Sequence, residues 1–129
     1  WIDIRELTPL QLDPTDVVLR LSVPPDGGVE VAKAASSQVG SKARWFFDWS
    51  GGLVWMALPT VSEESIAQIH SIAAAAGGHA VVMRADENTR LRNCVFQRLS
   101  NPAMALTKQL KRAFDPAGIL NPSRVFEGI

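Results

Sequence analysis

The chain has 129 residues, of which 47% are hydrophobic and 20% charged, a composition typical of one globular domain and unlike that of a disordered segment. Thirteen basic residues balance thirteen acidic ones, so overall charge does not favour binding to nucleic acid or to an anionic membrane. A single cysteine excludes a disulfide within the chain and indicates a reducing compartment, and no apolar run approaches the roughly 20 residues of a membrane-spanning helix.

The first third of the sequence predicts a lead-in, a strand and a helix. Residues 1–16 contain two prolines and are expected to be extended. Residues 17–23 alternate between apolar and polar side chains, which predicts a strand with Arg20 on the face opposite the core. Residues 29–39 fit a short helix that ends at Gly40.

The middle of the sequence predicts a hairpin. Two aromatic and aliphatic runs, 44–49 and 53–58, are separated by Ser50-Gly51-Gly52. Strand alternation places Trp45 and Phe47 on one face of the first run, and Phe46 and Asp48 on the other. The hairpin region is richer in aromatic side chains than one small core requires, and we interpret the surplus as an interdomain surface: Trp45, Phe46, Phe47, Trp49 and Trp55.

A second helix and a last strand complete a known pattern. Thr60 and Glu63 form a capping box that begins a helix, Gly77-Gly78 ends it, and residues 79–84 read as a strand. The resulting βαββαβ order predicts an α+β, ferredoxin-like fold, in which two helices cover one face of a four-stranded antiparallel sheet.

The C-terminal part follows a helical pattern. Asn101-Pro102 is expected to cap a helix whose apolar stripe includes Leu106, Leu110 and Phe114. We therefore expect three parts: the lead-in 1–16, a ferredoxin-like domain 17–92, and a helical tail 93–129 that packs on the same domain.

Residues 110–124, Leu-Lys-Arg-Ala-Phe-Asp-Pro-Ala-Gly-Ile-Leu-Asn-Pro-Ser-Arg, resemble the C-terminal signature of FAD-linked oxidases. In that family a helix runs into Phe-Asp-Pro-x-Gly-Ile-Leu-Asn-Pro-Gly and then a basic residue. The segments 20–25 and 75–80, with the hairpin between them, are similar to the E-subunit branch of bacterial glycolate oxidase. The resemblance covers about residues 17–126.

Two departures from the family pattern matter. Ser123 stands where the family has glycine, which puts in doubt the tight turn after Pro122. The sequence has no Gly-x-Gly-x-x-Gly loop for the flavin pyrophosphate, so this chain by itself is not expected to hold FAD tightly. We expect it to be part of a longer protein that carries its own N-terminal FAD-binding domain.

The resemblance implies a flavoprotein subunit that works with a second flavin subunit and an iron–sulfur subunit to oxidise glycolate or a related 2-hydroxy acid. This chain would be the cap domain, which covers the flavin and lines the substrate cavity and is inactive alone. A cytoplasmic location is expected, peripheral to the inner membrane through the complex.

Three residues are candidates for the site implied by this resemblance. Asn121 and Arg124 are expected to contact the flavin ring, with a turn-forming amide and a solvated guanidinium as the alternatives. Arg20 is a candidate for binding the substrate carboxylate, because arginine can bind a carboxylate in a bidentate manner, although an ordinary solvated arginine fits the pattern as well.

The remaining chemistry-bearing residues favour structural roles. His79 at the start of a strand could act as a base, but lone histidines there are more often structural. His70 is expected to pack in a helix, and Cys94 to be a small buried apolar side chain. The two histidines lack metal-ligand spacing, so no metal is predicted. Since both histidines favour structural roles, no catalytic residue is assigned.

A second function is compatible with the same pattern. A stand-alone ferredoxin-like module could bind a small ligand or a protein through the aromatic sheet face. RNA binding is disfavoured, because Asp48 interrupts the aromatic strand and the net charge is zero. The signature tail favours the oxidase, since a stand-alone module has no need of it.

Overall fold

The computed structural model describes residues 1–40, 42–59, 61–126 and 128–129. The chain divides into two compact units, Trp1–Val95 and Phe96–Ile129, and each is described by itself. In the first unit the elements are, in chain order, α1 (Ile2–Arg5), η1 (Thr8–Leu10), β1 (Val17–Ser22), η2 (Pro25–Gly27), α2 (Gly28–Val39), β2 (Arg44–Asp48), η3 (Trp49–Gly51), β3 (Leu53–Leu58), α3 (Glu63–Ala75), β4 (His79–Arg84) and α4 (Glu87–Arg92). The second unit contains α5 (Asn101–Phe114).

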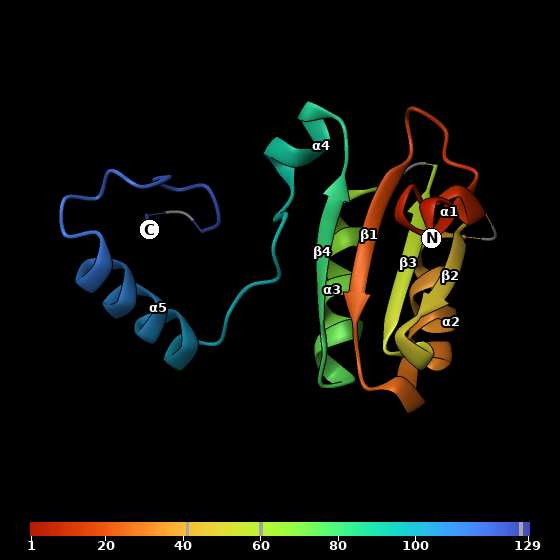
Figure 1. The fold of residues 1–129 in the computed structure, drawn as a ribbon, viewed down its shortest axis with the longest axis horizontal. Coiled ribbons are helices and arrows are strands. Elements are labelled where there is room, and N and C mark those ends of the chain that lie inside the picture. The colour runs from red at the N-terminus through yellow and green to blue at the C-terminus, as the bar shows by residue number, and fades with distance from the viewer. Residues whose placement is uncertain (41, 60, 127) are drawn as a thin grey trace. The chain divides into compact units, whose positions relative to one another are not determined.

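The sheet has the topology that the sequence predicts. Within the described residues it contains four antiparallel strands in the order β2-β3-β1-β4, so the two hairpin strands flank one side of β1 and the last strand the other. Figure 1 shows α2 and α3 together behind the sheet and α1 in front of it. The βαββαβ order and the two long helices on one face of the antiparallel sheet confirm the α+β, ferredoxin-like prediction.

The core lies between the sheet and the two long helices. Alternate residues of β1 and β3 point toward α2 and α3, and burying each such Leu, Ile or Val side chain contributes roughly 1.5–3 kcal/mol. The largest fully buried side chains of this core are Leu19, Leu21, Val54, Met56, Leu58, Ile66 and Ile69. The same alternation turns Arg20 and Trp55 to the opposite face, which we call the open face.

Two helix starts differ from the sequence prediction. Helix α3 is capped by Ser62, whose Oγ accepts from the amide N of Ser65 at 3.1 Å, while the expected cap, Thr60, lies outside the described residues. Helix α5 is capped by Ser100, one residue before the predicted Asn101, and Ser100 Oγ accepts from Ala103 N at 3.5 Å. A serine hydroxyl satisfies one of the free amides in the first turn in both cases.

The lead-in segment, residues 1–16, is not extended throughout as expected. It forms the short helix α1 and the 3₁₀ turn η1, and Leu10 at the end of η1 is fully buried. Leu7 and Gln11, which flank η1, adopt left-handed backbone angles and let the chain reverse at both ends of the turn. Residues 1–16 therefore fold back onto the rest of the first unit.

Candidate functional site

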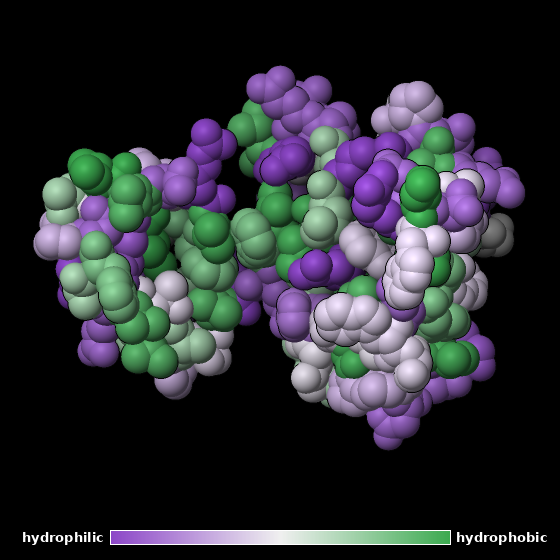
Figure 2. Space-filling model, in the orientation of Figure 1, coloured by the Kyte–Doolittle hydropathy of each residue, from purple (hydrophilic) through white to green (hydrophobic). Residues whose placement is uncertain are grey.

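The open face of the sheet carries polar and aromatic residues in cross-strand rows. Strand register places Arg20 directly between Trp55 of β3 and Val81 of β4. The next row places Ser22 between Leu53 and His79. Directly paired residues in an antiparallel sheet have Cβ atoms about 4.5–5.5 Å apart, so neighbours within each row touch. Figure 2 shows this side of the first unit, where pale and hydrophilic side chains lie between apolar ones.

Except for Val81, the residues of these two rows line a pocket of about 500 Å³. Its lining residues, all from the first unit, are Ile4, Arg5, Arg20, Ser22, Asp48, Trp49, Leu53, Trp55 and His79. The volume falls in the range of about 300–1,000 Å³ that is usual for small-molecule sites. The predicted substrate residue Arg20 therefore lies in a pocket, and His79, which was considered as a base but not assigned, lines the same pocket.

The Arg20 guanidinium is half-buried and has no ion-pair or hydrogen-bond partner among the residues that the structure describes. The neighbouring Arg5, by contrast, is paired with Glu6 at 2.8 Å. An unpaired cation in a partly apolar pocket attracts an anion, and a guanidinium matches the geometry of a carboxylate. Arg20 is thus free to bind an acidic ligand.

The hairpin turn that borders this pocket has an unusual backbone. Trp49 and Ser50 both adopt left-handed angles (φ 50° and 54°), and the Trp49 side chain is 74% exposed. The Asp48 carboxylate holds the turn by accepting from Trp49 N at 2.8 Å. Such angles persist where the surrounding structure enforces them, and they cluster at functional sites.

Close packing between Gly28, the first residue of α2, and Gly51 supports the hairpin turn. A Cβ on Gly28 would lie 2.0 Å from the carbonyl oxygen of Gly51, so only glycine allows the start of α2 to approach the hairpin this closely. The contact fixes η3, and with it Trp49, at the edge of the pocket.

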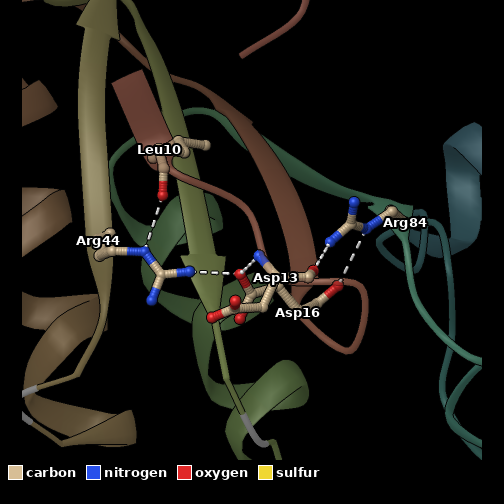
Figure 3. A network of polar contacts seen from close by, with 5 residues as sticks. All are labelled: Leu10, Asp13, Asp16, Arg44 and Arg84. Carbon is tan, nitrogen blue, oxygen red and sulfur yellow. Dashed lines mark hydrogen bonds and ion pairs between the residues drawn. The ribbon is translucent and has the colours of Figure 1, made fainter. Parts of the chain in front are cut away.

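A buried ionic cluster attaches the lead-in segment to the sheet (Figure 3). The Asp16 side chain is fully buried, and its Oδ2 accepts from Asp13 N at 2.7 Å and pairs with the Arg44 guanidinium of β2. Arg44 Nε donates to the Leu10 carbonyl at 2.8 Å, and Arg84 of β4 donates to the carbonyls of Asp13 and Asp16. This cluster was not predicted, because no local pattern links Asp16 to Arg44 and Arg84, which lie 28 and 68 positions away in the sequence.

In the second unit, Asp115 organises the signature tail. Its carboxylate accepts from the amides of Ile119 at 3.1 Å and Leu120 at 2.9 Å, and it pairs with Lys111 at 2.6 Å. The hydrogen bond from the Lys111 side chain, followed by that from the Leu120 amide, lowers the pKa of Asp115 to about 2. Lys111 also donates to the Leu120 carbonyl, so the end of α5 and the following turn are tied together.

The two predicted flavin-contacting residues lie close together in this tail. Asn121 has a left-handed backbone (φ 47°), and its carbonyl accepts from Arg124 N at 3.2 Å. Ser123, which replaces the family's glycine, also adopts a left-handed angle (φ 58°), so the tight turn forms without glycine. Asn121 lines an apolar groove of about 380 Å³ with Leu110, Phe114 and other residues of the second unit. The Asn121 and Arg124 side chains are both exposed, and neither makes a hydrogen bond to any described residue.

The histidines and the cysteine have different surroundings. His70 is 8% exposed on α3, and burial lowers its pKa, in agreement with a packing role. His79 is exposed in the pocket. The interpretation of Cys94 as buried is wrong, because it lies exposed in the segment that follows α4.

Over residues 1–40, 42–59, 61–126 and 128–129, there is no group of three His, Cys, Asp or Glu side chains that could hold a metal ion. None of the described helices is both long and apolar enough to cross a membrane.

The chain is similar to known proteins over parts of its length. Residues 92–125 match the family of FAD linked oxidases, C-terminal domain. Over 79 residues, the chain is 39% identical to the glycolate oxidase subunit GlcE of Escherichia coli (strain K12). The aligned segment is 61% of this chain and 20% of that relative, so the chain spans about a fifth of the length of the relative. No solved structure matches the chain. These matches confirm the resemblance of this chain to the C-terminal domain of FAD-linked oxidases and to the E subunit of glycolate oxidase.

Proposed function

We propose that this chain is the cap domain of a flavin-dependent 2-hydroxy-acid oxidase subunit, with glycolate-type acids as substrates, and that it is inactive alone. The observation that carries the proposal is the free Arg20 guanidinium in a pocket of a chain that matches FAD-linked oxidases. The open face of the sheet would form one wall of the substrate cavity, with Arg20 binding the carboxylate of the acid.

The residues present fit one part of a flavin. The Asn121 amide and the Arg124 guanidinium are both free of side-chain partners among the described residues, so they can donate to the carbonyl oxygens at the edge of the ring. The sequence has no glycine-rich phosphate loop, so the longer protein must bind the pyrophosphate elsewhere. When bound, FAD would supply the two-electron oxidant for the carbon that bears the substrate hydroxyl.

The chain's own contribution would be to bind and orient the substrate. A bidentate Arg20–carboxylate pair fixes both the position and the plane of the acid, and oriented binding of this kind accounts for a large part of enzymatic rate enhancement. In the complete assembly, a second flavin subunit and an iron–sulfur subunit would carry the electrons onward. The relative's name, a subunit of glycolate oxidase, supports the presence of other subunits but does not specify them.

The first test compares this chain with the full reading frame that contains it. We expect the full-length protein to be purified with bound flavin, visible by its absorbance, and this chain to be colourless. Asn121→Ala in the full-length protein should lower the flavin content, whereas Lys108→Ala on the exposed side of α5 should not. A full-length protein without flavin would contradict the oxidase and favour the stand-alone binding module.

The second test addresses Arg20 directly. In the flavin-loaded complex, Arg20→Gln should raise the KM for the 2-hydroxy acid tenfold or more, because a charge-assisted hydrogen bond contributes about 1.5–3 kcal/mol. Arg20→Lys should recover part of that loss. The control is Arg92→Gln, an exposed arginine on α4 that does not line the pocket. An unchanged KM in Arg20→Gln would show that the substrate carboxylate binds elsewhere.

A further inference from the structure

We infer that the pocket on the open face binds a monocarboxylic 2-hydroxy acid with a flat apolar body, such as an aryl-substituted acid, in preference to the two-carbon acid glycolate. The inference rests on the proposed oxidation of 2-hydroxy acids and favours larger members of that class over glycolate. It depends on three properties of the pocket: its width, its indole walls and the sign of its charges.

The pocket is wider than a two-carbon acid. Its lining extends across all four strands, from Asp48 on β2 through Leu53 and Ser22 to His79 on β4. Neighbouring strands lie about 4.8 Å apart, so the floor spans roughly 14 Å. In this chain by itself, a two-carbon acid paired with Arg20 would leave most of this floor in contact with water. A larger apolar body would cover the floor and gain roughly 25 cal/mol for each Å² removed from water.

Two indoles are placed to contact such a body. Trp55 is the direct cross-strand neighbour of Arg20, so a ligand whose carboxylate binds Arg20 lies against Trp55. Trp49 stands at the edge of the pocket, held there by its strained turn. Leu53, which is 7% exposed, also lines the pocket and adds an apolar side chain to it. Aromatic side chains favour flat apolar partners, with an added contribution of about 0.5–1.5 kcal/mol per ring pair.

The charges of the pocket favour one carboxylate on the ligand and disfavour a second. Asp48 lines the pocket, and its carboxylate accepts from the Trp49 amide but has no cationic partner among the described residues. It would therefore repel a second carboxylate that extended from Arg20 toward β2. The second cation of the pocket, Arg5, is already paired with Glu6.

The test uses the 129-residue chain and its own fluorescence. All four tryptophans lie in the first unit, and two of them, Trp49 and Trp55, line the pocket. We would titrate the chain with 3-phenyllactate, glycolate, 2-hydroxyglutarate and uncharged 3-phenyllactamide. Calorimetry would check each affinity independently of the fluorescence.

We expect 3-phenyllactate to bind at least tenfold more tightly than glycolate, 2-hydroxyglutarate or the amide. Arg20→Gln should weaken binding of 3-phenyllactate at least tenfold while leaving the affinity for the amide unchanged. Trp55→Leu should weaken 3-phenyllactate more than glycolate, and Arg92→Gln should weaken neither. Far-ultraviolet circular dichroism of each variant would show that the fold is retained.

Equal or tighter binding of glycolate, or binding of 3-phenyllactate that is indifferent to Arg20→Gln, would overturn the inference. This failure differs from failure of the proposed function. A full-length protein that contains flavin and oxidises glycolate, while the chain shows no preference for aryl acids, would retain the function and reject only the substrate class. Aryl-acid binding by a full-length protein that lacks flavin would support the pocket and reject the oxidase.

Discussion

Replacing Arg44 with methionine should destabilise the first unit more than any other single change in the ionic cluster. Methionine keeps much of the length and apolar character of the side chain but removes the cation. The fully buried Asp16 carboxylate would then keep one hydrogen bond, from the amide of Asp13. Removing one partner of a buried ion pair costs about 3–5 kcal/mol. Because the Arg44 side chain is 33% exposed, water can reach the cluster, so we expect the lower end, about 3 kcal/mol.

Arg84→Met is the matched control. Arg84 also donates two hydrogen bonds to the cluster, but both acceptors are neutral backbone carbonyls, those of Asp13 and Asp16. Its loss leaves no buried charge and should cost only about 1 kcal/mol. Urea unfolding followed by tryptophan fluorescence measures these values for the first unit alone, because the second unit contains no tryptophan.

A double variant gives the sharpest test of this explanation. If the cost of Arg44→Met comes from the unpaired carboxylate, adding Asp16→Asn should restore stability, because the buried group then carries no charge. Asparagine keeps an oxygen that can accept from the Asp13 amide. A double variant less stable than Arg44→Met alone, or an Arg84→Met variant that is equally destabilised, would refute the reasoning.

Three further changes follow from single contacts. Gly28→Ala places a Cβ against the Gly51 carbonyl and should cost at least about 2 kcal/mol in urea unfolding, whereas Gly27→Ala, with open space at its Cβ, should change stability by less than about 1 kcal/mol. Burial lowers the pKa of His70, so the stability that the neutral side chain provides is present above the ordinary value of 6.5 and is lost as the pH falls through the lowered value. In His70→Leu, the urea concentration at the midpoint of unfolding should therefore change less between pH 7 and pH 5. The pKa of Asp115 is about 2, so the contribution of this carboxylate to the stability of the tail is complete above pH 3.8 and is lost as the pH falls through 2. Amide chemical shifts of the tail, measured from pH 5 to pH 1.5, should follow that titration and should not change with pH in Asp115→Asn.

The sequence predicted the sheet because its signals were local. Alternation in β1 and the glycine-rich turn between β2 and β3 depend on neighbouring residues, and the strands formed at these positions. The face assignment of Trp45, Phe47 and Asp48 also holds, since the register pairs Trp45 with Met56 and Phe47 with Val54 of the core. Trp49, however, leaves the strand for η3, because the turn begins one residue earlier than the alternation suggested.

The site was harder to predict because it is assembled from distant segments. Arg20 could be chosen from one strand, but the pocket around it requires residues from α1, the hairpin and β4. Helix α4, which Asp86 caps by accepting from Thr89 N at 3.0 Å, was not predicted, although its Asp-x-x-Thr spacing was visible. The exposure of Cys94 depends on where the chain runs after α4, and local sequence does not determine that path.

The two candidate sites lie in separate units, so their roles can be separated by experiment. Arg20 lies in the first unit, and Asn121 and Arg124 lie in the second. If Arg20 binds substrate, Arg20→Gln should raise KM while the flavin content stays full. If Asn121 supports the flavin, Asn121→Ala should lower the flavin content, while the fraction that retains flavin shows an unchanged KM. For independent sites, the free-energy changes of the double variant should equal the sum of the single ones to within about 0.5 kcal/mol. Loss of flavin in Arg20→Gln would instead assign the open face to the cofactor, and the pocket would then have to be interpreted as a flavin site.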